Sequence, residues 1–421
     1  MSIVQWPISQ KYGGRMNKIL ILSSNCYGKT SANGLCALSI RNALINKGFE
    51  VDILGFIDDT GVGGNQGDGE YDIGVSYKEC FQKQNRCLFG KIANLFSLTF
   101  KKPINQKVVK LFYEKTLSLS EKKQYDVIIA MYFLPELVEV GRRIKQTNQQ
   151  IKFLIYEVDS SIDGINVKGL IQKISNHNTY RWLKRNYKIA DAVFALRCHE
   201  KYIKKNFFKE LVGKLVIVDL PLLQKKNTIV KKSRSGAAIN LFYTGLLDSN
   251  YRSPNKMLEI FKSSSITNLF LHFYSYGNCE SIIRQESDLN SNIIQHGQVP
   301  STELEKKMED ADLFINIGNS NSNSLPSKLV TYISCCKPII HIKMQEKDIC
   351  VEYLNKYPLA LIIDPNSSYA VKSFDSFILD NIGKNVEYDL IEKIFDECTP
   401  EFSAGEILKK IMELNGQNEK R

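Results

Sequence analysis

The sequence predicts an α/β fold built from two domains, each with a doubly wound parallel sheet, and three observations support this prediction. Short apolar runs recur along the chain, and most are followed by a helical pattern. The runs are rich in Ile, Leu and Val without polar alternation, which is typical of strands buried on both faces of a parallel sheet. At 421 residues, the chain is also too long for one ordinary hydrophobic core.

Strands are expected in both halves of the chain. In the first half they lie at Lys18–Ser23, Val51–Gly55, Asp126–Met131, Lys152–Glu157, Asp191–Leu196 and Lys214–Asp219. In the second half they lie at Asn240–Thr244, Leu269–Ser275, Asn292–Gln295, Asp312–Asn316, Pro338–Ile342 and Leu359–Asp364.

Helical patterns fill the segments between these strands. Apolar residues four apart predict a helix that Gly48 is placed to end. These residues are Cys36, Ile40 and Leu44. Further along, Thr302 and Glu305 form a capping-box pattern, which predicts a helix that continues through Asp310.

One segment, Pro221 to Gly236, is polar and basic and has no apolar period. We therefore expect it to link an N-terminal domain of residues 16–221 to a C-terminal domain of residues 222–421, both Rossmann-like. Two such domains are expected to face each other across a cleft, since open α/β sheets bind ligands at the carboxyl ends of their strands. Residues 1–14 are polar and are expected to be a leader without a signal-peptide core.

The composition excludes several classes of protein. With 43% hydrophobic and 24% charged residues, the chain is neither disordered nor collagen-like. Its longest strongly apolar run, Val127 to Leu134, is far short of a membrane-spanning helix. The ten cysteines contain no C-x-x-C pair, and the five histidines contain no H-x-x-x-H pair. These patterns predict free thiols in a reducing cytoplasm and no metal site.

The net charge of +11 is unevenly distributed. Between Gln82 and Lys123 there are ten basic and two acidic residues, a net charge of +8 in one segment. Such a field attracts phosphates or anionic lipid. Within it, Cys87 to Lys102 mixes aromatic and aliphatic residues with lysines, which fits either a membrane-inserting surface or a helix pair that covers the sheet. Nucleic acid is not expected as a partner, because no recognised binding module accompanies the charge.

The strongest functional segment runs from Asn316 to Ile340. A strand ends near Asn316, a polar Asn/Ser loop follows, and a helix is expected to open with Pro326 in its first turn. The free amides of that turn, the Ser327 hydroxyl and the Lys328 ammonium would together form an anion site suited to a diphosphate. A serine-capped helix beside a flexible loop is the alternative interpretation.

A second segment, Leu241 to Arg252, runs from a strand into a turn at Gly245. An arginine seven residues after that glycine can clamp phosphate oxygens with two hydrogen bonds. The alternative is a solvated surface arginine.

Together with Ala32–Cys36 and Ile294–Pro300, these two segments resemble the two-domain GT-B glycosyltransferases, in particular the family-four enzymes of bacterial surface polysaccharide assembly. The resemblance covers nearly the whole chain from Met16 and implies transfer of a sugar from a nucleotide-diphosphate donor. It also implies a retaining reaction without an essential metal or other cofactor. The donor is expected on the second domain and the acceptor against the first.

The resemblance assigns roles to individual residues. Gly34 is expected in the loop after the first strand, where it approaches the donor phosphates or the acceptor. The diphosphate would be held by Arg252, Ser327 and Lys328. The nucleobase would be flanked by Gly277 and by the turn from His296 to Val299.

The chain departs from the family pattern at two positions. Family-four enzymes commonly carry two glutamates eight residues apart, and this chain has Asn323 and Thr331 there. Thr331 takes the position of the ribose-binding carboxylate, and Asn323 can still hydrogen-bond a sugar hydroxyl. Glu157 and Asp159, which follow an earlier strand, are the candidate acid and base residues; a helix cap or an ion-pair partner is the alternative role.

The resulting prediction is a cytoplasmic, peripherally membrane-associated glycosyltransferase that acts on a glycan or lipid-linked acceptor in capsule or lipopolysaccharide synthesis. A GT-B-shaped protein without transferase activity, which binds a sugar nucleotide or a partner, is an alternative that the missing glutamates favour. A nucleotide-sugar epimerase is another. A P-loop NTPase is disfavoured, because Ser23 stands where a glycine must precede Gly28-Lys-Thr30. We interpret the segment Gly61 to Gly69 as a loop and Asp310-x-Asp312 as a helix-end turn.

Overall fold

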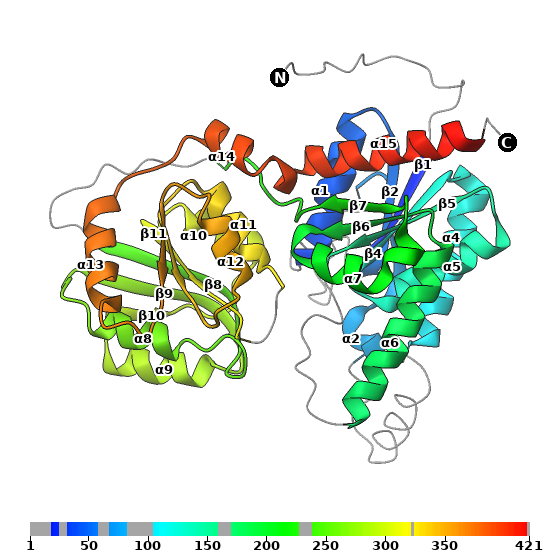
Figure 1. Cartoon of the computed structure of the whole chain (residues 1–421). Helices are drawn as coiled ribbons and strands as arrows, with labels where there is room; N and C mark the ends of the chain where they lie inside the picture. The colour runs from blue at the N-terminus through cyan, green and yellow to red at the C-terminus, as the bar shows by residue number, and fades with distance from the viewer. Residues whose placement is uncertain are drawn as a thin grey trace. The chain divides into compact units, whose positions relative to one another are not determined.

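The computed structural model describes residues 18–24, 32–57, 67–81, 104–158, 170–226, 238–320 and 324–418 (Figure 1). These residues form two compact units. The first contains the described residues from 18 to 221 and from 400 to 418, and the second contains those from 222 to 399. They are called unit 1 and unit 2.

Unit 1 contains a seven-stranded, fully parallel sheet in the order β3-β2-β1-β4-β5-β6-β7. Its strands are β1 Lys18–Leu22, β2 Glu50–Ile57, β3 Glu70–Ser76, β4 Val127–Tyr132, β5 Lys152–Glu157, β6 Ala192–Leu196 and β7 Leu215–Val218. The order reverses between β1 and β4, as in a Rossmann fold. Every residue of β4 and β6 is buried, which explains why the apolar runs were readable from the sequence.

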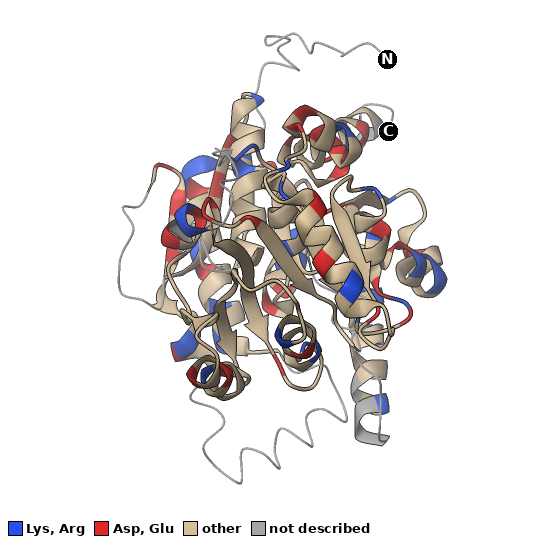
Figure 2. Ribbon diagram, turned by 90° about the vertical axis from the view of Figure 1, so that its left-hand side faces the viewer, with Lys and Arg blue, Asp and Glu red and all other residues tan. Residues whose placement is uncertain are grey.

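Helices cover both faces of this sheet. They are α1 Ala32–Asn46, α2 Tyr77–Phe81, α4 Gln106–Lys123, α5 Pro135–Thr147, α6 Leu170–Ile189, α7 Glu200–Leu211 and α15 Pro400–Asn418. A short 3₁₀ turn, Arg197–His199, precedes α7. The helices α4 to α7 pack side by side in one layer, while α1 packs against α15. Figure 2 shows that charged residues lie mainly on helices and loops, whereas the strands carry few.

The C-terminal helix α15 departs from the expected domain division, because it belongs to unit 1 rather than to the second domain of residues 222–421. Its apolar residues Ala404, Ile407 and Ile411 are buried, and it contacts α1 and β7 (Figure 1). The Ser403 hydroxyl lies 2.9 Å from the Tyr156 hydroxyl of β5. An amphipathic pattern predicts a helix but does not indicate which sheet the helix packs against. The sequence therefore could not assign α15 to unit 1.

Unit 2 contains a six-stranded, fully parallel sheet in the order β10-β9-β8-β11-β12-β13. Its strands are β8 Ile239–Leu247, β9 Leu269–Gly277, β10 Ile293–Gln295, β11 Leu313–Ile317, β12 Ile339–Ile342 and β13 Ala360–Ile363. This is again the Rossmann order, and the switch point lies between β8 and β11.

The helices of unit 2 are α8 Asn255–Lys262, α9 Glu280–Leu289, α10 Ser301–Met308, α11 Ser327–Ser334, α12 Ile349–Leu354, α13 Ala370–Asn381 and α14 Tyr388–Ile394. A 3₁₀ turn, Asp396–Cys398, follows α14. One hydrophobic cluster joins the sheet to α8, α9 and α13, with Met257, Ile283 and Phe374 among its buried residues. On the helix α11, Leu329, Val330 and Ile333 are also buried. The fold predicted for each domain is therefore confirmed.

Two local predictions fail for physical reasons. The edge strand β3 was not expected, because its residues are mostly polar and half-buried and it contains Gly74. The expected capping box also fails, because the N-cap of α10 is Pro300, so Thr302 lies within the helix, which ends at Met308. Asp310 does lie in a helix-end turn, where its amide donates to Lys307 O.

Several predicted features lie outside the described residues. They are residues 1–17, most of the Gly61–Gly69 segment, the apolar-basic segment Cys87–Lys102, and residues 227–236 of the linker. Among the described helices, none combines the length and the apolar character that a bilayer span requires.

Gly141 gives a test of how tightly unit 1 is packed. A β-carbon at Gly141 would lie 2.1 Å from Cε2 of Phe153, whose side chain is fully buried in the sheet. We expect Gly141→Ala to lower the free energy of unfolding by about 2 kcal/mol, because the ring must move in a close-packed core.

Gly405 provides a matched control within the same unit. It lies in α15 with no atom within 4 Å of its added β-carbon. Gly405→Ala should raise the free energy of unfolding by about 0.5–1 kcal/mol, because alanine is the better helix former. Urea unfolding followed by circular dichroism measures both changes, and equal effects of the two substitutions would contradict the packing argument.

Candidate functional site

The switch point of unit 2 opens because β8 and β11 pair over only two residues. Leu241 and Phe242 pair with Leu313 and Phe314, whereas β8 pairs with β9 along its whole length, from Ile239 to Leu247. Beyond Phe242 the two central strands separate toward their carboxyl ends. Open α/β sheets bind ligands in this crevice.

A tyrosine from α11 fills the opening between the strands. The hydroxyl of Tyr332 accepts a hydrogen bond from Thr244 N at 2.7 Å and lies 3.2 Å from Thr244 O. Its ring stacks on Phe314, with 4.6 Å between centroids, and its side chain is almost fully buried. Tyr332 therefore fixes α11 against the second half of β8. Tyr332 could not be singled out from the sequence, because its partner is 88 positions away.

Arg252 lies just after β8, in a turn closed by Asp248. The two residues exchange backbone hydrogen bonds of 2.8 and 3.2 Å. Nε and Nη2 of Arg252 donate to Asn319 Oδ1 at 3.0 and 2.6 Å, and Nη1 lies 3.4 Å from Leu246 O. Within the described residues, no carboxylate forms an ion pair with this guanidinium. It is thus a positioned, half-buried cation rather than a free surface arginine.

Asn319 was not singled out from the sequence, although it lies in the Asn/Ser loop that follows β11. It joins this loop to the loop after β8 through its bonds to Arg252. The same two loops are also joined through their backbones, since Ser320 N donates to Tyr251 O at 2.8 Å. The run of short polar residues was the available signal.

Lys328 comes from the first turn of α11 and is half-buried. A β-carbon at Gly245, where φ is +123°, would lie 3.5 Å from Cγ of Lys328, so the lysine stem runs along the end of β8. Arg252 and Lys328 therefore meet β8 at consecutive residues, Gly245 and Leu246. That the two cations share one ligand remains a prediction.

The Lys328 ammonium forms no ion pair or hydrogen bond with any described residue. Burial lowers its pKa, Glu305 opposes that shift, and Lys226 adds to it. Glu305 is itself paired with Lys226 at 3.1 Å. A half-buried ammonium without its own counterion is costly, so this position favours an anion.

The amino end of α11 offers further donors. Its N-cap is Pro326, which makes no side-chain capping bond, so the amides of the first turn have no cap among the described side chains. Ser327 lies at the first helical position and is half-buried. Thr331, by contrast, donates from Oγ1 to Ser327 O at 3.4 Å, within its own helix.

The expected nucleobase region lies at the ends of β9 and β10. Gly277 has φ of +118°, and an added β-carbon would lie 2.1 Å from Leu247 O, so only glycine fits there. His296 is exposed, and its ring stacks on Tyr274, with centroids 4.1 Å apart. Val299 is half-buried between β10 and α10.

Two histidines in this region bond to each other. His272 Nδ1 lies 3.0 Å from His296 Nε2, and His272 Nε2 lies 3.1 Å from Asn240 Oδ1. Burial and the neighbouring His296 lower the pKa of His272 to about 4, against a weaker opposing effect of Asp310. Burial and Lys307 also lower the pKa of His296. Both rings are therefore neutral near pH 7, which suits stacking rather than phosphate binding.

The candidate residues of unit 1 do not form a comparable site among the described residues. Gly34 was expected in a loop but is buried in the first turn of α1, because the helix begins at Ala32. Glu157 is 3% exposed, and its Oε1 accepts a hydrogen bond from Tyr187 OH. Its acid or base role remains a prediction, as does the donor contact of Gly34. Asp159 and Asn323 lie outside the described residues.

A buried polar cluster supports the loop after β11. Asn316 Nδ2 lies 2.8 Å from His341 Nδ1, and His341 Nε2 lies 3.0 Å from Asp348 Oδ2. Asp348 and Cys350 complete the one group of potential metal ligands among the described residues. Both ring nitrogens of His341 are engaged, and burial raises the pKa of Cys350 well above its usual value. We therefore assign the cluster a structural role.

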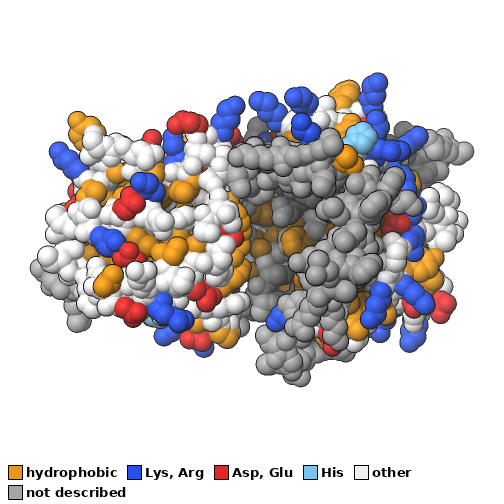
Figure 3. Space-filling view, turned by 90° about the horizontal axis from the view of Figure 1, so that it is seen from below, with side chains coloured by type: hydrophobic (Ala, Val, Ile, Leu, Met, Phe, Trp, Pro, Cys, Tyr) orange, Lys and Arg blue, Asp and Glu red, His pale blue; other side chains and the backbone are white. Residues whose placement is uncertain are grey.

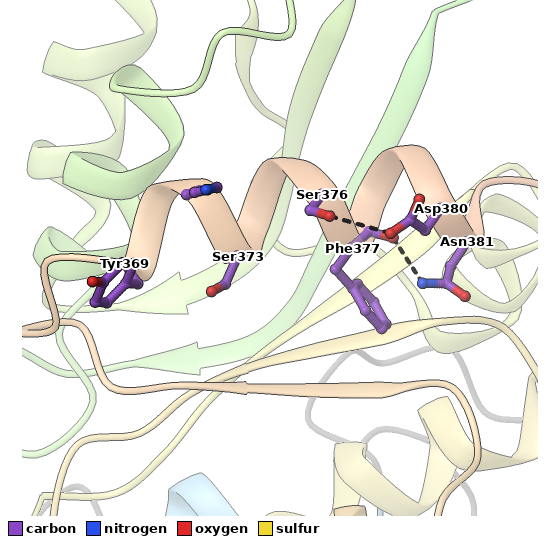
Figure 4. A pocket seen from close by; sticks show the side chains of 7 residues that line it. Tyr369, Ser373, Ser376, Phe377, Asp380 and Asn381 are labelled. Atoms are coloured by element: carbon purple, nitrogen blue, oxygen red, sulfur yellow. Dashed lines mark hydrogen bonds between the residues drawn. The ribbon is translucent and has the colours of Figure 1, made fainter.

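A shallow hollow on the outer side of α13 is not a candidate binding site (Figure 4). Its lining comes from this helix and its N-cap residue Tyr369, without groups that converge from other elements. The hydroxyl of Ser376 donates to Asp380 Oδ2 at 3.2 Å along the helix.

The sequence matches no protein-family model and no curated protein. Its structure is similar to that of several solved proteins. One is the N-terminal domain of a trehalose-6-phosphate phosphatase from Candida albicans, with a TM-score of 0.60 and 13% identity over 96% of this chain and 98% of that chain. A glycosyltransferase from Rickettsia africae gives a TM-score of 0.59 and 13% identity over 94% and 98%.

A third similar structure is the lipopolysaccharide outer core galactosyltransferase WaaB. Its TM-score is 0.56 with 12% identity, over 94% of this chain and 99% of that chain. At such identities the likeness shows the fold, which is the two-domain Rossmann-like arrangement predicted from the sequence. Fold alone does not give the reaction, and these neighbours include the N-terminal domain of a phosphatase as well as transferases.

The histidine pair predicts how acid affects unit 2. The pKa of His272 is about 4 in the folded chain against 6.5 for an ordinary histidine, so below pH 6.5 the unfolded chain binds a proton that the folded chain does not. The free energy of unfolding should therefore fall as the pH drops from 6.5 toward 4, and be unaffected by this group above 6.5.

Proton NMR titration of the ring C2–H signals measures this directly, and the signals are assigned with His272→Gln and His296→Gln. We expect the His272 signal to move near pH 4 and the urea midpoint of unit 2 to fall less steeply with acid in His272→Gln. A His272 signal that titrates near 6.5 would contradict the buried-pair geometry.

Proposed function

We propose that this chain, which has the GT-B fold, is a glycosyltransferase that moves a sugar from a nucleotide-diphosphate donor to a glycan or lipid-linked acceptor in surface polysaccharide synthesis. The observation that carries the proposal is the half-buried ammonium of Lys328, which has no ion pair among the described residues and reaches β8 next to the residue that Arg252 contacts. Unit 2 would bind the donor and unit 1 the acceptor. The named function of WaaB supports the surface-glycan context.

The donor site is explained by charge. A diphosphate carries negative oxygens that the guanidinium of Arg252 can contact with parallel hydrogen bonds. Lys328 and the amino end of α11 supply further positive charge, which is the role a divalent cation plays in metal-dependent enzymes. We therefore propose a metal-independent reaction.

Bond cleavage would be assisted at the same place. When the bond between the sugar carbon C1 and the diphosphate oxygen breaks, negative charge grows on the leaving diphosphate, and both cations stabilise it. The acceptor hydroxyl oxygen then bonds to C1 and loses its proton. Glu157 and Asp159 remain the proposed acid and base residues, and Asn323 the proposed contact to the donor sugar. The retaining outcome rests on the family resemblance.

The nucleoside would extend from the diphosphate toward the ends of β9 and β10. The exposed ring of His296, stacked on Tyr274, offers a flat surface for a base. Gly277 permits a close approach of backbone there. We further propose that the protein works in the cytoplasm, peripherally on the inner face of the membrane, where a lipid-linked acceptor is reached.

One observation favours a second candidate function, a donor-binding protein without transferase activity. Helix α11 carries no acidic residue, and Thr331 uses its hydroxyl on its own helix. Donor binding without transfer, in an assay with extracts of acceptor glycans and lipids, would favour this second function.

Replacing Lys328 separates binding from stability. In Lys328→Met, we expect the dissociation constant for the selected nucleotide-sugar donor to rise between about 10-fold and 100-fold, because a charge-assisted contact to phosphate is lost. The ligand-free protein should be at least as stable as the wild type, because the substitution removes a half-buried charge that has no ion pair among the described residues.

Calorimetry with a panel of nucleotide sugars and thermal unfolding measure these two effects. Lys356→Met, an exposed lysine of the same unit, serves as the control and should change neither. If Lys328→Met binds donor as tightly as the wild type, the proposed diphosphate site is wrong.

Asn319 tests the positioning of Arg252. Asn319→Ala removes the acceptor of two arginine hydrogen bonds, so we expect about 10-fold weaker donor binding with the guanidinium still present. Ser320→Ala, which removes a weaker 3.2 Å bond to Asn250 O in the same loop, is the control. Similar losses in both variants would indicate a general loop defect instead.

A further inference from the structure

The helix α6 carries an unusual distribution of charge. Its twenty residues include five basic and no acidic side chains. All five are exposed: Lys173, Arg181, Lys184, Arg185 and Lys188. The opposite side of the helix is apolar, with Trp182, Leu183 and Tyr187 buried in the core of unit 1.

The neighbouring helix α7 adds charge and exposed apolar groups. Lys201, Lys204, Lys205 and Lys209 are exposed on it. Between and beside them lie Phe208, 65% exposed, and Val212, 64% exposed, four residues apart. Few hydrophobic side chains of the described chain are so open to solvent.

The two helices form one surface. They pack against each other in the same layer, where Tyr180 of α6 stacks on Phe207 of α7. Together they hold nine basic and two acidic residues, a net charge of +7 out of +11 for the whole chain. The two acids are engaged within the surface, since Glu210 pairs with Lys184 and Glu200 with Lys204. Figure 3 shows basic side chains along the upper margin of its view with hydrophobic ones among them.

We propose that this α6–α7 surface docks unit 1 onto an anionic lipid bilayer, with Phe208 and Val212 inserted among the headgroups and the lysines and arginines in contact with lipid phosphates. The proposal rests on the proposed function, which places the protein at a membrane. The α6–α7 surface is distinct from the apolar-basic segment Cys87–Lys102, which the sequence suggested for membrane contact. The inference rests on the exposed residues of α6 and α7 alone.

The combination of groups favours lipid over other polyanions. Duplex nucleic acid would be attracted by the lysines, but its charged backbone offers no apolar surface to Phe208 and Val212. At a bilayer interface both kinds of side chain favour binding, because basic residues contact anionic headgroups while apolar side chains leave water. The complementary charge and the position of Phe208 among lysines therefore point to one occupant.

The test measures vesicle binding of the full chain. Sedimentation with phosphatidylcholine vesicles, with and without phosphatidylglycerol, should show binding only to the anionic vesicles and a loss of binding at high salt. In Lys201→Gln/Lys205→Gln/Lys209→Gln we expect about 100-fold weaker binding, at about fivefold for each basic residue. The fluorescence of Phe208→Trp should shift to shorter wavelength on binding.

Matched controls keep the test specific. Lys347→Gln/Lys356→Gln/Lys393→Gln removes the same charge from exposed positions of unit 2 and should bind like the wild type. Phe208→Ser/Val212→Ser should weaken binding, whereas Leu289→Ser, at a residue that is 77% exposed in unit 2, should not. Circular dichroism confirms that each variant is folded.

Three outcomes would overturn the proposal: no binding of the wild type to anionic vesicles, equal losses in the patch and control triple variants, or tight binding to duplex DNA with none to vesicles. Vesicle binding is read without sugar transfer, and donor binding is read without vesicles. A failure of this surface is therefore distinguishable from a failure of the proposed transferase activity.

Discussion

The hydrogen bonds between Tyr332 and Thr244 are the interaction on which the candidate site depends. Where β8 and β11 stop pairing, Thr244 N loses the partner that a continuing strand would provide, and a buried amide without a partner is costly. The tyrosine hydroxyl supplies that partner at 2.7 Å. The Tyr332 hydroxyl thus satisfies the strand where its pairing stops and holds α11 against β8.

The positions of both cations follow from this constraint. With α11 fixed, Lys328 lies along β8 at Gly245, whose lack of a side chain leaves room for the lysine stem. Asn319 holds Arg252 and joins the loops after β8 and β11. The cluster of Asn316, His341 and Asp348 is buried directly beneath the second of these loops. The candidate site is therefore held by α11, by the end of β8 and by the loops after β8 and β11.

The sequence predicted the strands because they are buried on both faces, and it predicted Arg252 and Lys328 because each follows the end of a strand. It did not show Tyr332 or Asn319, whose partners are 88 and 67 positions away. Nor did it show β3, a half-buried edge strand, or the return of α15 to unit 1. Local patterns reveal which residues form an element, whereas the partner of a side chain or helix is decided by topology.

The same region contains several departures from the rules of stable folding. The central strands of the sheet separate early, α11 lacks a side-chain cap, and a half-buried ammonium has no counterion among the described residues. Each lowers stability by itself, and natural proteins concentrate such costs where function requires them. A diphosphate would offset two of them at once, since it would accept bonds from the uncapped amides and neutralise the lysine. The coincidence of these costs at a switch point is what distinguishes a ligand site from a poorly packed helix end.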